Sequence, residues 1–127
     1  MDLNAVTENI IGAMIEVHRE LSAGLLESAY EECLCHEMTL RGLRFRRQVP
    51  LPVTYKGLKL ECGYRVDVLV EEAIVLEVKS VKALESIHEA QLITYLKLGG
   101  WPIGLLVNFN VKVLKDGLKR RVNNYTS

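Results

Sequence analysis

The strongest structural signal of the chain lies in two neighbouring apolar runs within residues 64–80. The first reads Tyr64-Arg65-Val66-Asp67-Val68-Leu69-Val70, and the second reads Ile74-Val75-Leu76-Glu77-Val78-Lys79-Ser80. Both runs are rich in Val, Ile and Leu, and the polar pair Glu71-Glu72 separates them, a pattern that is typical of a hairpin. We therefore predict two antiparallel strands, over Leu58–Val70 and Ala73–Ser80.

Three charged residues interrupt these apolar strands. Glu77 and Lys79 are two apart, so their side chains point to the same face, and the hairpin brings Asp67 beside them if the register is favourable. Burying such charges is costly unless they are paired or bound to a metal. Carboxylate oxygens without nearby His or Cys suit Mg²⁺ or Mn²⁺. We predict a divalent-metal site, while the spacing alone leaves open a structural ion pair of Lys79 with Glu77 or Asp67.

The remaining pattern predicts three helices and further strands around this hairpin. Apolar residues at helical spacing indicate a first helix from Leu3 to Leu21 and a second from about Leu25 to Leu40. A capping box at Ser86-Ile87-His88-Glu89 starts a third helix, which ends at Gly99-Gly100. The predicted strands are Phe45–Val49, Pro52–Tyr55, the two above and Ile103–Phe109; the closing segment Val111–Val122 is compatible with strand or helix. The order α-α-β-β-β-β-α-β predicts one α/β domain over residues 1–127, with a mixed central sheet flanked by helices.

Polar residues on two of these helices are further candidates for the site. Gln91 and Tyr95 are four apart, on the helical face that also carries apolar residues, so their polar tips are drawn toward the core. Glu27 lies at the border of the apolar stripe of the second helix. With Gly24 as the N-cap, Glu27 has a purely structural interpretation as an acid at the positive end of the helix dipole.

Charge is unevenly distributed although the formal net charge is zero. Residues 1–40 carry eight acidic and one basic side chain, whereas residues 41–65 carry seven basic and one acidic. A basic face is therefore compatible with nucleic acid, and so is a set of scattered, solvated charges. The candidate phosphate contacts are Arg41, Arg44, Arg46, Arg47, Lys119, Arg120 and Arg121.

Cysteine use and hydropathy suggest a location. Cys33, Cys35 and Cys62 are odd in number and fit no zinc spacing, which indicates reduced core thiols. The first residues lack the pattern of a signal peptide, and no apolar run approaches the ~20 residues that span a bilayer. We expect a cytosolic protein without membrane contact. We expect His18 to be structural and His88 to belong to the start of the third helix.

Together these residues resemble a known motif set. Asp67 followed by Glu77-Val78-Lys79 resembles the D…(D/E)xK signature of the PD-(D/E)xK nuclease superfamily, and Gln91–Tyr95 resembles the QxxxY motif of its RecB-like branch. The segment Gly24–Tyr30 is similar to the one that names the GxxExxY protein family. Similarity to that family covers roughly Ile10 to Val122, and it implies a fold of the restriction-endonuclease type.

The resemblance implies a role for each residue. Asp67 and Glu77 would hold Mg²⁺ or Mn²⁺, with the Val78 carbonyl and Glu27 completing the ligand shell directly or through water. Lys79 would position the attacking water or offset charge on the phosphate. Gln91 and Tyr95 would orient Lys79 or grip the substrate.

Three functions are weighed on this basis. The first is a metal-dependent nuclease that hydrolyses phosphodiester bonds of DNA or RNA, alone, as a homodimer or beside a partner protein. The second is a nuclease-like fold kept as a nucleic-acid-binding or assembly module without turnover; such a module has no need of the full set of six site residues. The third, a hydrolase with a Ser, Cys or His nucleophile, has no Gly-x-Ser-x-Gly elbow to support it.

Overall fold

The computed structural model describes residues 1–61 and 63–125. Along the chain, two α-helices are followed by five strands, a third α-helix, a sixth strand, a 3₁₀ turn and a seventh strand. The helices are α1 (Leu3–Leu21), α2 (Glu27–Leu40), α3 (Ser86–Gly99) and the 3₁₀ turn η1 (Leu114–Gly117); the strands are β1 (Phe45–Pro50), β2 (Val53–Tyr55), β3 (Leu58–Leu60), β4 (Arg65–Val70), β5 (Ile74–Lys79), β6 (Ile103–Asn108) and β7 (Leu118–Val122). No helix among the described residues is long and apolar enough to cross a membrane.

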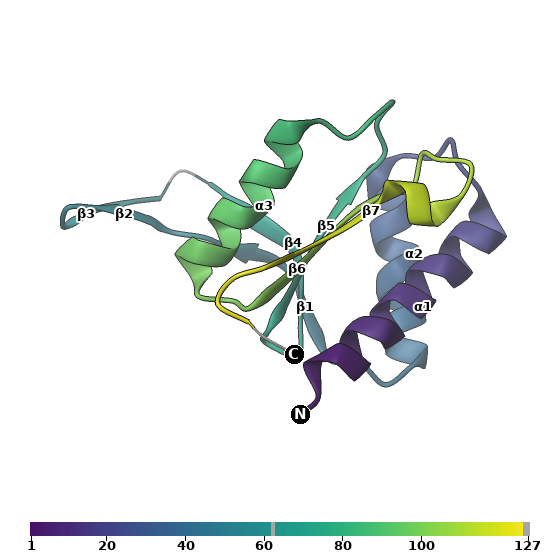
Figure 1. Ribbon diagram of the computed structural model, residues 1–127, viewed down its shortest axis with the longest axis horizontal. Helices are drawn as coiled ribbons and strands as arrows, with labels where there is room; N and C mark the ends of the chain where they lie inside the picture. Colours follow the sequence, from purple (N-terminus) through teal and green to yellow (C-terminus); the bar gives the residue numbers. More distant parts are fainter. Residues whose placement is uncertain (62, 126–127) are drawn as a thin grey trace.

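Five strands form the central sheet in the order β1-β4-β5-β6-β7. Strands β5 and β6 are parallel, because α3 carries the chain back between them, and the other neighbours are antiparallel. Figure 1 shows α1 and α2 on one face of this sheet and α3 on the other. The prediction of a mixed sheet flanked by helices is confirmed, including the β4–β5 hairpin.

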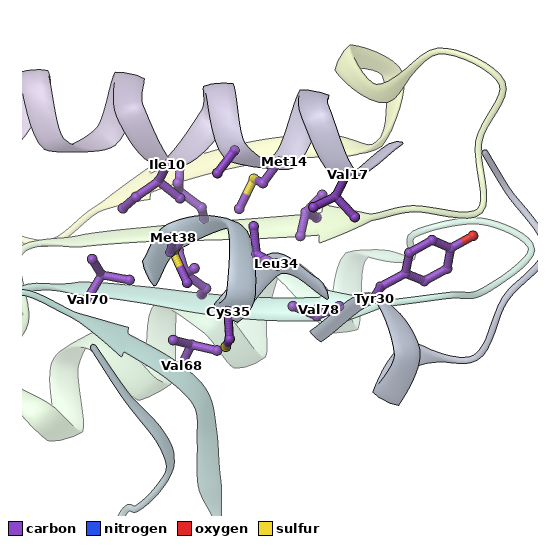
Figure 2. Packing of buried hydrophobic residues seen from close by; sticks show 14 of the residues in the cluster. Ile10, Met14, Val17, Tyr30, Leu34, Cys35, Met38, Val68, Val70 and Val78 are labelled. Atoms are coloured by element: carbon purple, nitrogen blue, oxygen red, sulfur yellow. The ribbon is translucent and has the colours of Figure 1, made fainter. Parts of the chain in front are cut away.

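Alternation along the strands divides the core into two layers. The larger layer packs α1 and α2 against side chains such as Val68, Leu76 and Val78. Figure 2 shows Met14 and Leu34 of these helices pointing into that layer. The smaller layer packs α3 against residues such as Leu69 and Val75, whose side chains point to the opposite face. Asp67 and Glu77 share the parity of Leu69 and Val75, so they belong to the face of the sheet that α3 covers.

The predicted strand Leu58–Val70 is wrong as a single element. Leu58–Leu60 pairs with β2 in a separate two-stranded sheet, and the main-sheet strand begins only at Arg65. Gly63 between them has φ +78°, a conformation that interrupts an extended strand, and the carbonyl of Tyr64 accepts a hydrogen bond from the Leu51 amide. As a result β2 and β3 form a hairpin that projects from the body of the molecule (Figure 1); we call residues 51–61, 63 and 64 the arm.

Helix starts and the closing segment also differ in detail from the predictions. Helix α2 begins at Glu27 with Leu26 as its N-cap, so Glu27 is the first helical residue, and Gly24 does not cap the helix. The capping box of α3 is formed by Glu85 and His88, one residue before the predicted start, because the His88 ring accepts from the Glu85 amide. The open choice for Val111–Val122 resolves into η1 followed by β7.

The cysteines fit the prediction of core thiols only in part. Cys35 is buried, and burial raises the pKa of its thiol to about 11, whereas Cys33, also on α2, is exposed. Cys62 lies outside the described residues.

Candidate metal centre

The sheet is interrupted at one point, and that point is Asp67. Regular pairing between β4 and β5 ends at Val68–Leu76, one step before Asp67 and Glu77 would face each other. On the other side of β4, pairing with β1 skips the position of Gln48, which has φ +51°. Strain in a non-glycine residue at such a place is a feature of functional sites. Asp67 therefore lies in a local opening of the sheet between three strands.

Side chains replace the missing backbone hydrogen bonds at this opening. The Asp67 amide donates to Oε2 of Glu77 at 2.9 Å, and the Val78 amide donates to Oδ2 of Asp67 at 2.8 Å. The two carboxylates are thus held in place by each other's strand. This reciprocal arrangement fixes the two acids before any ligand arrives.

Burial makes this acidic pair electrostatically unusual. Glu77 is only 5% exposed, and burial together with the charge of Asp67 raises its pKa to about 8. Burial likewise raises the pKa of Asp67, while the Val78 amide works against that rise. The positive charge of Lys79 lowers both pKa values but does not offset the burial. In a protein without bound cations, the pair consequently retains a proton near neutral pH.

Lys79 ends β5 on the same face as Glu77, and it is half-buried. Among the described residues, the salt bridges involve arginine side chains, and Lys79 forms none with Asp67 or Glu77. The structure therefore does not contain the alternative, a structural ion pair of Lys79 with Glu77 or Asp67. An ammonium group beside two acids, without a salt bridge to either, is available to a ligand.

Helix α3 brings Gln91 and Tyr95 to the same face of the sheet. Nε2 of Gln91 donates to the Tyr95 hydroxyl at 2.9 Å, as expected for residues four apart. Burial raises the pKa of Tyr95, and the negative charge of Glu77 adds to the rise. The tyrosine is therefore close enough to the acidic pair to sense its charge.

Glu27 reaches the end of β5 from the other side of the sheet. Its Oε2 accepts from the Ser80 amide at 3.4 Å, and the Ser80 hydroxyl donates to the Leu25 carbonyl at 2.5 Å. Within residues 1–61 and 63–125, no three His, Cys, Asp or Glu side chains are close enough together to hold a metal ion. Glu27 is consequently near the pair without completing a direct three-carboxylate cluster.

Sequence reasoning missed two residues at this site, Glu31 and Gln48. Glu31 is 8% exposed, and its negative charge contributes to the raised pKa values of both Asp67 and Glu77. Nε2 of the Gln48 side chain donates to Oε1 of Glu31 at 3.2 Å, which links the strained position in β1 to α2. The available signal was the spacing of Glu27 and Glu31, which are four apart and share a helical face.

The basic residues proposed as phosphate contacts fall into two groups. On β1, Arg46 pairs with Glu72 at 2.7 Å and Arg47 pairs with Glu31 at 2.8 Å, while Arg44 lies 3.6 Å from Glu71. Arg41 pairs with Glu37 on α2. On β7, at the opposite edge of the sheet, Arg121 pairs with Glu89 and Arg120 contacts Asn4; Lys119 shares this strand. The geometry does not gather the two groups around Asp67.

Both histidines singled out from the sequence have structural contacts. Nε2 of His18 lies 2.8 Å from the Val111 carbonyl oxygen, so this ring ties α1 to the segment before η1. His88 belongs to the α3 capping box described above.

A mixed sheet with helices on both faces, opened at an acidic pair with a lysine beside it, defines a nuclease-like α/β protein. The chain belongs to the PD-(D/E)XK nuclease superfamily, whose family model matches residues 4–121. Nucleases of this superfamily typically use divalent metal ions. No curated protein and no solved structure matches the chain.

Proposed function

We propose that the protein is a metal-dependent nuclease that hydrolyses phosphodiester bonds of DNA or RNA. The observation that carries this proposal is the reciprocally hydrogen-bonded pair of Asp67 and Glu77, buried beside Lys79. Burying two acids so close together destabilises their charged forms, and a bound divalent cation would offset that cost. The unfavourable free energy of burying two carboxylates is explained if the pair binds a ligand.

The donor set fits Mg²⁺ or Mn²⁺. Carboxylate oxygens of Asp67 and Glu77 would hold the ion, with the Val78 carbonyl as a further ligand and Glu27 acting through water. When bound, such an ion supplies a Lewis acid for the phosphodiester and a water molecule of lowered pKa. The raised pKa values of the pair support this assignment, because a cation would allow both acids to ionise.

Lys79, Gln91 and Tyr95 would act on the substrate and the water. The Lys79 ammonium would orient the attacking water or neutralise charge that develops on the phosphate, and no salt bridge to the pair must break first. The Gln91–Tyr95 hydrogen bond holds the tyrosine hydroxyl in one orientation, from which it would position Lys79 or the substrate backbone.

Phosphate contacts from Arg44, Arg46, Arg47, Lys119, Arg120 and Arg121 stay a prediction. To bind Arg46 or Arg47, a phosphate would have to replace the carboxylate that each arginine contacts. The free-energy cost of that exchange is small only at an exposed pair such as Arg46–Glu72. We further propose that residues 1–127 form one domain of the GxxExxY, RecB-like type and act in the cytosol; the motif order and the free thiols of Cys33 and Cys35 support this.

Cleavage of labelled single- and double-stranded DNA and RNA tests the proposal. The wild type is compared with Lys79→Ala, and with Lys115→Ala as the control for loss of an exposed lysine on η1. We expect cleavage of at least one substrate with Mn²⁺ or Mg²⁺, its loss in EDTA, and a rate lower by ~10²–10³ for Lys79→Ala alone.

Two other outcomes would redirect the interpretation. Mn²⁺ binding by the wild type without cleavage of any substrate would favour the alternative of a nucleic-acid-binding or assembly module, with or without a second subunit. Cleavage that persists in EDTA would contradict metal dependence, and with it the assignment of Asp67 and Glu77.

A further inference from the structure

A groove of about 490 Å³ lies between the arm and helix α3. Val53, Leu60 and Tyr64 line it from the arm, and Ile87, Tyr95 and Leu98 line it from the helix. Several of these apolar side chains face solvent: Ile87 is 66% exposed and Tyr64 is 46% exposed. Clustered exposed apolar side chains of this kind mark a binding surface.

The groove shares two residues with the candidate metal centre. Gln91 and Tyr95 line the groove and also belong to the site, and the Tyr64 ring meets the Tyr95 ring edge to face at a centroid distance of 6.3 Å. The charge of Glu77 reaches the Tyr95 hydroxyl. A molecule seated in the groove would therefore contact Gln91 and Tyr95, the two α3 residues of the candidate metal centre.

The lining combines flat apolar surface with a few polar groups. Tyr64, Ile87 and Leu98 provide the apolar part. His88, Gln91 and Thr94 place hydrogen-bonding groups along one side, on successive turns of α3. A nucleobase has this complementary character, since its faces are apolar and its edge carries donors and acceptors. Stacking on aromatic side chains is how proteins hold unpaired bases.

The charge distribution argues against recognition of a duplex through its backbone. Tight binding to a duplex relies on many lysine and arginine contacts to phosphate. Here the formal net charge is zero, and Arg46, Arg47 and Arg121 are already paired with carboxylates. A net charge of zero provides little general attraction to the phosphate backbone, so contacts to bases should supply a larger share of the affinity for a nucleic acid.

We infer that the groove between the arm and α3 receives an unpaired nucleobase of a single-stranded nucleic acid and presents the adjoining phosphate to Asp67 and Glu77. The inference rests on the proposed nuclease function, and it names the substrate class of that site. Tyr64 is the stacking surface, and Ile87 forms the opposite wall. DNA and RNA carry similar bases, so the experiment compares a single strand of DNA with a single strand of RNA.

Fluorescence of 2-aminopurine in a single-stranded 12-mer, as DNA and as RNA, measures the predicted stacking. Titrations in EDTA compare the wild type with Tyr64→Ala and with Tyr55→Ala. Tyr55 is a matched control because it is 61% exposed on the same arm and does not line the groove. The wild type is expected to quench the fluorescence, Tyr64→Ala to bind ~5–100-fold more weakly, and Tyr55→Ala to bind like the wild type. The strand that binds with the higher affinity, DNA or RNA, identifies the preferred substrate class.

A second variant keeps the test decisive if Tyr64→Ala does not fold. Ile87→Glu places a negative charge in the groove at the second residue of α3, where an acid suits the helix dipole and folding is preserved. Ile15→Glu on α1 is its control, as an isoleucine that is 50% exposed away from the groove. Ile87→Glu should abolish quenching, and Ile15→Glu should leave it unchanged.

Three outcomes would overturn the inference. The first is tighter binding of a duplex than of either single strand. The second is wild-type affinity in both Tyr64→Ala and Ile87→Glu. The third is a dimer that Ile87→Glu converts to monomer, which would assign the groove to a second copy of the chain. Because these titrations contain no metal, they are independent of cleavage: duplex cutting that Tyr64→Ala leaves intact would refute the inference and preserve the nuclease proposal.

Discussion

Replacing Glu77 by glutamine removes the most strongly perturbed carboxyl of the candidate site and changes little else. The amide oxygen of glutamine can still accept the hydrogen bond from the Asp67 backbone. What the variant loses is a group whose pKa rises from 4.5 to about 8 on folding. The stability of the metal-free protein should therefore respond to this substitution in a pH-dependent way.

The sign follows from proton linkage. Because the folded state holds the proton of Glu77 more tightly than the unfolded state, stability is fully present below the unfolded pKa and is lost as pH rises through about 8. At ~1.4 kcal/mol per pH unit, the difference corresponds to a loss of about 5 kcal/mol, an upper bound because Asp67 shares in the titration. The Glu77→Gln variant lacks this loss, so above pH ~8 without metal it should be the more stable protein.

Urea unfolding in EDTA between pH ~5 and ~9, followed by the fluorescence of Trp101, measures the effect. Trp101 is the only tryptophan, and it packs against the core layer on the same face of the sheet as Glu77. Glu20→Gln, at an exposed position on α1, is the control for the loss of one carboxylate. Mn²⁺ at ~100 times its Kd should then restore about 2.7 kcal/mol to the wild type, and much less to Glu77→Gln.

Two results would refute this reasoning. A wild-type stability that stays flat from pH ~5 to ~9 in EDTA would mean that the pair is not strained by burial. Equal stabilisation of the wild type and Glu77→Gln by Mn²⁺ would show that Glu77 is not a ligand.

Three further predictions concern the surroundings of the site. Arg47→Ala strips the buried Glu31 of its cationic partner and leaves only the Gln48 side-chain amide, so it should cost about 1–3 kcal/mol of unfolding free energy, whereas Arg46→Ala, at an exposed pair, should be indistinguishable from the wild type in the same urea titration. Gly117→Ala should destabilise by about 1–3 kcal/mol, because its Cβ would lie 2.2 Å from the Asn108 carbonyl oxygen; an unchanged melting temperature would contradict that packing. Iodoacetamide at pH ~8 should modify the exposed Cys33 and spare Cys35, whose pKa is raised to about 11 by burial; peptide mapping that finds both alkylated in the folded protein would refute this.

Site residues could be predicted from the sequence where the indication lay within a single strand or helix. Asp67, Glu77 and Lys79 stand out because charge is costly inside apolar strands, and Gln91 and Tyr95 follow from helical spacing. Gln48 carries no such mark: its significance comes from a left-handed backbone conformation opposite Asp67, which only the assembled sheet imposes. The carboxylate partners of Arg46 and Arg47 are likewise brought by tertiary structure, so charge counting could not anticipate that these arginines are engaged.

The fold was predictable to a similar degree. Periodicity located the three α-helices and the β4–β5 hairpin, because these elements bury regular apolar stripes, but it left the segment that contains η1 and β7 open. It failed at Gly63, where the sequence pattern is compatible with a strand but the positive φ of the glycine interrupts the extended backbone. It also misplaced the starts of α2 and α3 by one to two residues, since several neighbouring polar residues can each act as an N-cap.

The most direct test of the central claim is the single-turnover cleavage rate at saturating Mn²⁺, measured for the wild type and Lys79→Ala on whichever labelled strand the wild type cuts. If Asp67 and Glu77 hold the ion and Lys79 acts on the water or phosphate, Lys79→Ala should bind Mn²⁺ as the wild type does and cleave ~10²–10³-fold more slowly. A folded Lys79→Ala protein that cleaves at the wild-type rate would contradict the proposed mechanism.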